Sequence, residues 1–132
     1  MSVGYFVKIR DNLIFVNDRF AIKVTDDKAN VINGLEEFDE FVSATAVHDN
    51  QYLAIAYRHM GVRFYALKED SQKQVLNLVY EIPANKFPFF LHLSDIAYYS
   101  ISRSKNLLLL DEREGVVSLQ LHFENHHTIK HK

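Results

Sequence analysis

Apolar residues in this chain occur in short runs separated by polar or glycine-containing turns. Over 41–47 the apolar positions recur at every second residue, which is the period of a half-buried strand. Leu53–Tyr57 is a continuous apolar run, and Gly61–Leu67 follows it after a few polar residues, as in a β-hairpin. A fourth run over 75–82 ends at Pro83, which cannot donate to a strand ladder. The pattern therefore predicts four consecutive antiparallel strands in this part of the chain.

The stretch 68–74 between the third and fourth runs is polar, and we expect it to be a solvated linker. A short helix over 69–80 is the competing interpretation, because Val75, Leu76 and Val79 have helical spacing. His48 and Asp49 lie between the first two runs and are interpreted as a turn.

The same succession of runs recurs along the chain. Residues 47–67 align with 101–121 at a constant offset of 54, without a gap. A weaker copy lies upstream at an offset of 40. Such spacings are typical of four-stranded repeat units. The chain is thus predicted to be one domain, 1–132, with repeat units over 3–33, 41–82 and 92–123 and a polar, His-rich tail over 124–132.

The alignment also pairs Gly61 with Gly115 after a polar turn, whereas Ala21 takes this place in the first unit. Glycine readily adopts positive φ, so we expect a left-handed residue or a bulge at both glycines. The fourth strand of the third unit would fall in 125–132, which is too polar for the pattern to predict a strand.

The middle unit carries a resemblance to a known class. It reads Asp-Asn-Gln-Tyr-Leu-Ala-Ile-Ala over 49–56 and Gly-Val-Arg-Phe-Tyr-Ala-Leu over 61–67. These segments are similar to β-propeller blades of the WD40-like or LVIVD-like kind, although the chain has no Trp and so lacks the Trp-Asp dipeptide of WD40 repeats. The resemblance implies an all-β fold of antiparallel four-stranded meander repeats, in a partial β-propeller-like arc of about three blades.

An arc of three blades is incomplete, because propellers typically close with four to eight. Its flanks and strand edges would lack a partner, and such edges favour association. We therefore expect a protein partner or a second copy of the chain to complete the arc, which makes the protein a homo-oligomer or an assembly subunit. Two alternatives are that the chain is a piece of a longer propeller and that its three sheets fold into a sandwich or barrel.

Composition narrows the classes of function. The chain has 132 residues, a formal net charge of −2 and no Cys. The charge offers no broad positive surface for nucleic acid, and the lack of thiols excludes cysteine nucleophiles and cysteine-containing zinc sites. No uncharged apolar run is long enough to span a membrane, and the first residues lack the apolar core of a signal peptide. We expect a soluble protein of the cytoplasm or another intracellular compartment.

The candidate binding residues follow from the predicted topology. In a four-stranded meander, the turns between the second and third strands share one face with the connections between units. This face collects Arg58 and His59 from one turn, Arg113 from the next, and Phe87, Phe89 and Phe90 from a connection. Arginine and aromatic rings are enriched among interface anchors, so we predict that these residues bind a protein partner. The alternative is that the three rings fill the gap between blades or begin a strand.

No pattern in the sequence indicates catalysis or a cofactor. Phosphate-binding glycine loops, a nucleophile elbow and the His-Glu-x-x-His motif are missing. The acidic run 36–40 is interpreted as a solvated loop, and the C-terminal histidines as a polar tail rather than a metal site. We therefore predict a non-catalytic protein–protein interaction scaffold that belongs to a larger propeller or assembly and uses no cofactor. The alternative is a fragment or subunit of a propeller enzyme with its site in the central channel.

Overall fold

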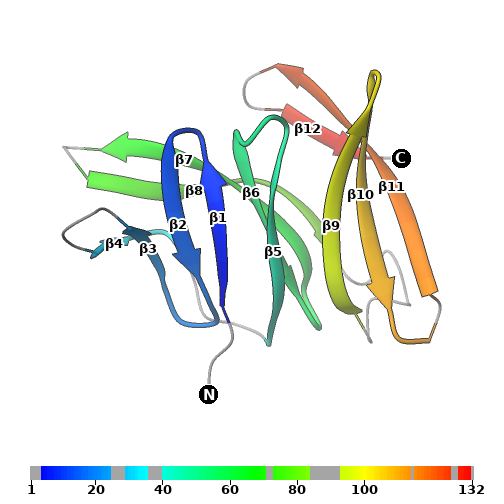
Figure 1. Ribbon diagram of the computed structural model, residues 1–132, viewed down its shortest axis with the longest axis horizontal. Coiled ribbons are helices and arrows are strands. Elements are labelled where there is room, and N and C mark those ends of the chain that lie inside the picture. The colour runs from blue at the N-terminus through cyan, green and yellow to red at the C-terminus, as the bar shows by residue number, and fades with distance from the viewer. Residues whose placement is uncertain are drawn as a thin grey trace.

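A computed structural model describes residues 4–24, 29–35, 40–70, 73–83, 93–113, 115–125 and 128–131. These residues form twelve strands and connecting turns, without a helix (Figure 1). The strands make three antiparallel four-stranded sheets, in each of which a strand pairs with the next one along the chain. Within the described residues no helix is long and apolar enough to cross a membrane.

The three sheets follow one another along the sequence. Sheet 1 holds β1 (Tyr5–Ile9), β2 (Asn12–Val16), β3 (Ala21–Val24) and β4 (Ala29–Ile32). Sheet 2 holds β5 (Phe41–Val47), β6 (Tyr52–Tyr57), β7 (Gly61–Asp70) and β8 (Lys73–Pro83). Sheet 3 holds β9 (Leu93–Ile101), β10 (Ser104–Asp111), β11 (Gly115–Asn125) and β12 (Thr128–His131).

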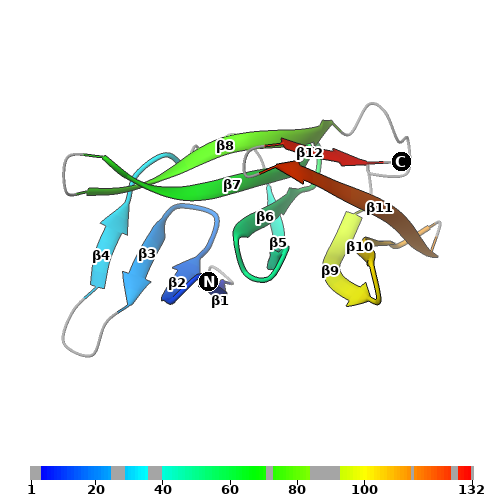
Figure 2. The same ribbon diagram turned by 90° about the horizontal axis from the view of Figure 1, so that it is seen from above.

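The sheets pack face to face as a partial, propeller-like arc. The first strand of each sheet lies beside the first strand of the next, so β5 contacts both β1 and β9 (Figure 1). The fourth strands lie on the opposite side of the arc, where β8 contacts β4 and β12 (Figure 2). The predicted fold class, all-β with four-stranded meander repeats in an arc of about three units, is confirmed.

Sheet 2 is buried on both faces because it lies between the other two sheets. Every residue of β6 is buried, and alternate side chains enter different hydrophobic clusters. Leu53 and Ile55 pack against sheet 1, whereas Ala54 and Ala56 pack against sheet 3. A strand covered on both faces needs a continuous apolar run, which is why this segment gives the clearest signal in the sequence.

The β7–β8 hairpin is longer than the sequence pattern predicts. Paired residues continue to Asp70 and Lys73, so most of the expected linker 68–74 is strand and the alternative helix over 69–80 is wrong. The side chains here are polar, but main-chain hydrogen bonds hold the two strands together. Figure 2 shows the hairpin extending beyond β5 and β6 towards sheet 1.

The last described part of the chain also contains a strand that its polar sequence does not predict. β12 pairs with β11, and Ile129 lies opposite Phe123. Ile129 is buried and enters the cluster between sheets 2 and 3. Within the expected polar tail over 124–132, Thr128–His131 thus forms a strand that completes sheet 3, because an apolar side chain and a backbone ladder suffice on an edge strand.

The pairing registers correct the alignment of the first unit by one residue. Gly61 lies opposite Tyr57 and Gly115 opposite Asp111, and each has the predicted positive φ, +102° and +88°. In sheet 1, Ala21 lies opposite Val16, one pair further from the turn. The β2–β3 turn is one residue shorter than the other two, so Phe20 rather than Ala21 takes the place of the glycine.

Candidate functional site

The turns that the sequence predicts as a binding face do share one edge of the arc. Figure 1 shows the β2–β3, β6–β7 and β10–β11 turns at its lower edge. Arg58 in the β6–β7 turn is fixed to Glu40, since its Nε lies 2.7 Å from Glu40 Oε2 and its backbone N donates to the Glu40 carbonyl at 2.9 Å. This double contact ties the turn to the beginning of β5.

His59 and Arg113 are exposed on this edge, on turns of neighbouring sheets. The backbone N of Arg113 donates to Asp111 Oδ1 at 2.8 Å, which sets the turn. Phe87, Phe89 and Phe90 lie outside the described residues, so the aromatic part of the prediction stays a prediction. The polar residues of the prediction lie on one edge, where Arg58 is paired with Glu40.

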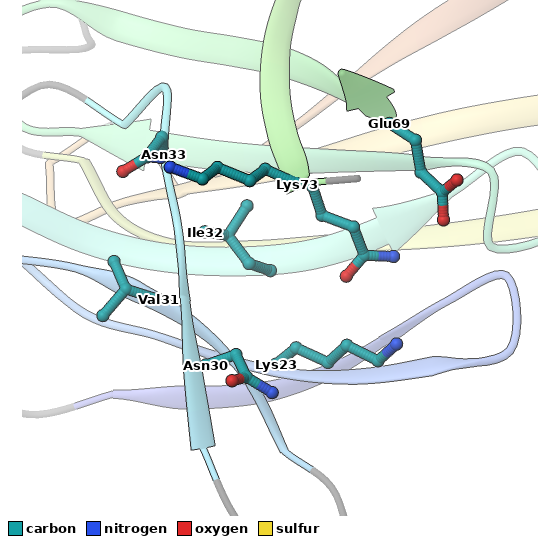
Figure 3. Close-up of a pocket in the computed structure, with 8 residues that line it drawn as sticks. Lys23, Asn30, Val31, Ile32, Asn33, Glu69 and Lys73 are labelled. Atoms are coloured by element: carbon teal, nitrogen blue, oxygen red, sulfur yellow. The ribbon is translucent and has the colours of Figure 1, made fainter. Parts of the chain in front are cut away.

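A polar cleft lies between sheet 1 and the β7–β8 hairpin, and no pattern in the sequence indicated it. Its volume is about 510 Å³. The lining residues are Lys23, Asn30, Val31, Ile32, Asn33, Glu69, Lys73 and Gln74. Figure 3 shows the Lys73 side chain reaching towards Asn33, with Glu69 and Lys23 at the other end of the cleft. Amides and charges of both signs can hold a small polar group, but the lining lacks a nucleophile–base pair of the kind covalent catalysis needs.

This cleft exists because the hairpin is fastened to the end of sheet 1. Asn33 bridges Val75, and the backbone N of Leu76 donates to the Asn33 carbonyl at 2.7 Å. Gly34 follows with φ +104°, and a Cβ there would overlap the Leu76 carbonyl oxygen. The contact joins residues far apart in sequence. The sequence would have indicated the cleft only if its pattern had also predicted the long β7–β8 hairpin.

A stacked aromatic cluster closes the junction between sheets 2 and 3. The His48 ring stacks on Phe123 with centroids 4.1 Å apart, and His48 Nδ1 lies 2.6 Å from Lys105 Nζ. Burial raises the pKa of the Tyr98 hydroxyl, and a hydrogen bond with the His48 backbone partly opposes this by lowering the pKa. His48 lies in the predicted turn, which is confirmed, and the cluster couples sheets 2 and 3.

The end face of sheet 1, on the side away from sheet 2, is an exposed apolar surface. Its row across the four strands pairs Phe6 with Phe15, Phe15 with Ile22 and Ile22 with Val31. The Phe6 and Phe15 rings are 5.0 Å apart, and Phe20 joins them at 6.3 Å from Phe15. Phe6, Leu13, Phe20 and Val31 are all exposed. Contiguous apolar surface on a folded chain marks an interaction site.

The sequence predicts that the arc has open flanks, but it does not single out these residues. Phe6 and Leu13 have the same alternation as residues that are buried in the other sheets, so their pattern contains no sign of exposure. Lys8 is the charged residue of this face within the described strands, and it lies opposite Leu13.

Within the described residues no group of three potential metal ligands comes together. His126 and His127 lie outside the described residues, so the interpretation of the histidine-rich end stays untested. Comparisons with protein-family models, with curated proteins and with solved structures found no match to this chain.

Proposed function

We propose that this chain is a non-catalytic protein–protein interaction scaffold, built from repeats of the WD40-like or LVIVD-like kind, that works within a larger propeller or assembly. One observation carries the proposal: the end face of sheet 1 is apolar across all four strands and exposed. Phe6 is 67% exposed, although the aromatic side chains of such sheets are normally covered.

The order of the sheets supports this function. Each internal junction buries a face of the same kind, in the clusters between sheets 1 and 2 and between sheets 2 and 3. A face that is apolar yet uncovered gains free energy from a partner, at roughly 25 cal/mol per Å² of apolar surface removed from water. The exposed Arg113 and His59 on the lower edge supply a second, polar region at which a partner is able to bind.

Leu13 and Leu78 allow a matched test. Leu13 lies on the end face of sheet 1 and is 44% exposed, and Leu78 lies on β8 in sheet 2 and is 43% exposed. Sedimentation equilibrium of the purified chain over a range of concentrations should show association. Leu13→Ser should weaken it strongly, while Leu78→Ser leaves it unchanged. A wild-type chain that stays monomeric, or equal effects of the two substitutions, would contradict the proposal.

A further inference from the structure

The exposed sheet faces at the two ends of the arc correspond to the two sides of a sheet–sheet junction. The chain contains two such junctions, one between sheets 1 and 2 and one between sheets 2 and 3. The pairing registers identify the equivalent positions: Phe6 lies opposite Phe15, Ala44 opposite Ile55, and Ile96 opposite Leu109. Each of these pairs joins the first and second strands of its sheet on the side facing the preceding sheet. We call this side the leading face of a sheet, and the opposite side its trailing face.

The leading face is buried wherever a preceding sheet exists. Ala44 is 7% exposed beneath sheet 1 and Ile96 is 5% exposed beneath sheet 2. Phe6, at the same place in sheet 1, is exposed, and none of the described sheets packs against it. Leu13 repeats the comparison, since the equivalent Leu53 and Leu107 are fully buried.

The trailing face of a sheet is likewise buried where another sheet follows it. Val16 opposite Ala21 in sheet 1 and Ala56 opposite Val62 in sheet 2 are fully buried against the sheet that follows. Leu110 opposite Val116 is the equivalent pair in sheet 3, and both of these residues are exposed. The open surface at the end of the arc is therefore apolar beside the β10–β11 turn, whereas Ser118 and Gln120 stand further along β11 in the places of Phe64 and Ala66.

We propose that a second copy of this chain closes the arc, with the trailing face of sheet 3 in each copy packed on the leading face of sheet 1 in the other. This inference rests on the proposed scaffold function and names its partner. Both halves of the missing junction are present on one chain, so two copies satisfy all four open faces. The two new junctions are related by a twofold axis, as in most closed homo-oligomers.

Closure by two copies gives six sheets, which lies within the range of four to eight found in closed propellers. A single copy cannot close on itself with three sheets, and an unrelated partner would have to reproduce both halves of the junction. The second copy also covers the apolar row that contains Phe6, Phe15 and Val31. The leading face of sheet 1 offers little to repel it, since Lys8 is the charged residue among its described strand positions.

Engineered cysteines test this arrangement cleanly, because the chain has no Cys of its own. Leu13→Cys labels the leading face of sheet 1, and Leu110→Cys labels the trailing face of sheet 3. The equivalent residues Leu53 and Val16 share one buried cluster, and Leu107 and Ala56 share the other. Both leucines are well exposed, so the substitutions should leave the fold intact, which circular dichroism checks. Leu78→Cys is the matched control on β8.

The closed ring predicts an asymmetric result with a bifunctional maleimide, which joins thiols on opposite sides of a packed junction that are too far apart for a disulfide. Equal amounts of Leu13→Cys and Leu110→Cys chains should become cross-linked to each other, while either variant alone, and Leu78→Cys with Leu110→Cys, stays unlinked. Sedimentation should give a species of two chains at a chain mass of 15.4 kDa. Phe6→Ser should raise its dissociation constant at least tenfold.

The failures of the ring and of the scaffold function can be told apart. Self-linking of Leu13→Cys alone, or masses that grow without limit in an open filament, would overturn the closed ring and leave a scaffold that associates through sheet 1. A wild-type chain that is monomeric at every concentration, together with Leu13→Cys and Leu110→Cys chains that do not cross-link, would overturn both.

Discussion

The side chains of Asn17 and Asp111 hold equivalent turns in sheets 1 and 3. Asn17 Oδ1 accepts hydrogen bonds from the backbone N of Arg19 at 2.9 Å and of Phe20 at 3.0 Å. Asp111 Oδ1 accepts one from the backbone N of Arg113 at 2.8 Å. Both side chains are buried, and both stand where their strand leaves the sheet. A short side-chain acceptor can therefore satisfy turn amides that have lost their ladder partners.

Replacing Asn17 with Ala should lower the free energy of unfolding by about 1–2 kcal/mol, because two turn amides lose their acceptor. Urea denaturation followed by circular dichroism measures this loss. Asn17→Asp keeps the accepting oxygen and serves as the control, with a smaller change expected. Equal losses for the two variants would show that the volume of the side chain, and not its oxygen, stabilises the turn.

Gly34 and Gly115 separate steric overlap from backbone strain. Both have positive φ, but a Cβ at Gly34 would overlap the Leu76 carbonyl oxygen, whereas a Cβ at Gly115 has nothing within 4 Å. Gly115→Ala should destabilise the fold by about 1 kcal/mol through strain alone. Gly34→Ala should cost more, and should loosen the contact of the hairpin with sheet 1. Amide hydrogen exchange at Leu76 should quicken in Gly34→Ala alone; unchanged exchange there would contradict this account.

The buried hydroxyl of Tyr65 has no hydrogen-bond partner within the described residues. An unsatisfied buried hydroxyl is unfavourable, whereas the ring that carries it packs in the cluster between sheets 1 and 2. Tyr65→Phe should therefore leave stability unchanged or raise it by up to about 1 kcal/mol. Thermal denaturation measures the change. A clear fall in melting temperature would mean that the hydroxyl does have a partner.

Stability should fall in alkaline solution because two tyrosine hydroxyls have a higher pKa in the folded chain than in the unfolded chain. Burial is the main cause that raises the pKa of Tyr52, with Arg10 opposing it, and burial likewise raises the pKa of Tyr98. In the unfolded chain tyrosine ionises near its ordinary value of 10.0. The folded state therefore keeps these two protons to a higher pH. The stability that the two hydroxyls contribute is fully present below about pH 10 and is lost as the pH rises through the folded pKa.

Melting temperatures measured between pH 8 and pH 11 test this. The wild-type curve should bend downwards above about pH 10, and Tyr98→Phe should bend less, because phenylalanine has no proton to lose. The same slope in both proteins would mean that Tyr98 ionises as readily in the folded chain as in the unfolded one.

Much of the fold is visible in the sequence because strand alternation is a local property. The runs that become β5, β6 and β7 are evident in the order of apolar and polar residues, and so are the offsets that relate the three units. The positive φ at Gly61 and Gly115 follows from the same alignment. Where polar side chains occupy paired backbone, as at Glu69 and His131, the alternation disappears, and the long hairpin and β12 are missed.

The candidate surfaces divide likewise into one that the sequence pattern predicts and one that it does not. The predicted turn face exists, and its basic residues lie where the topology requires, because the order of hairpins alone determines which turns share an edge. The polar cleft depends on a contact between Asn33 and Leu76, which no local pattern reports.

By itself, the sequence determined that the chain forms repeated, four-stranded antiparallel units, because period and turn spacing are set by the backbone geometry of each segment. Only the tertiary structure decided which apolar faces are covered. Phe6 and Ile96 hold equivalent places with equally apolar side chains, yet one is exposed and the other buried. Burial depends on the sheet that packs opposite, and among the sheets that the structure describes one lies opposite Ile96 and none opposite Phe6.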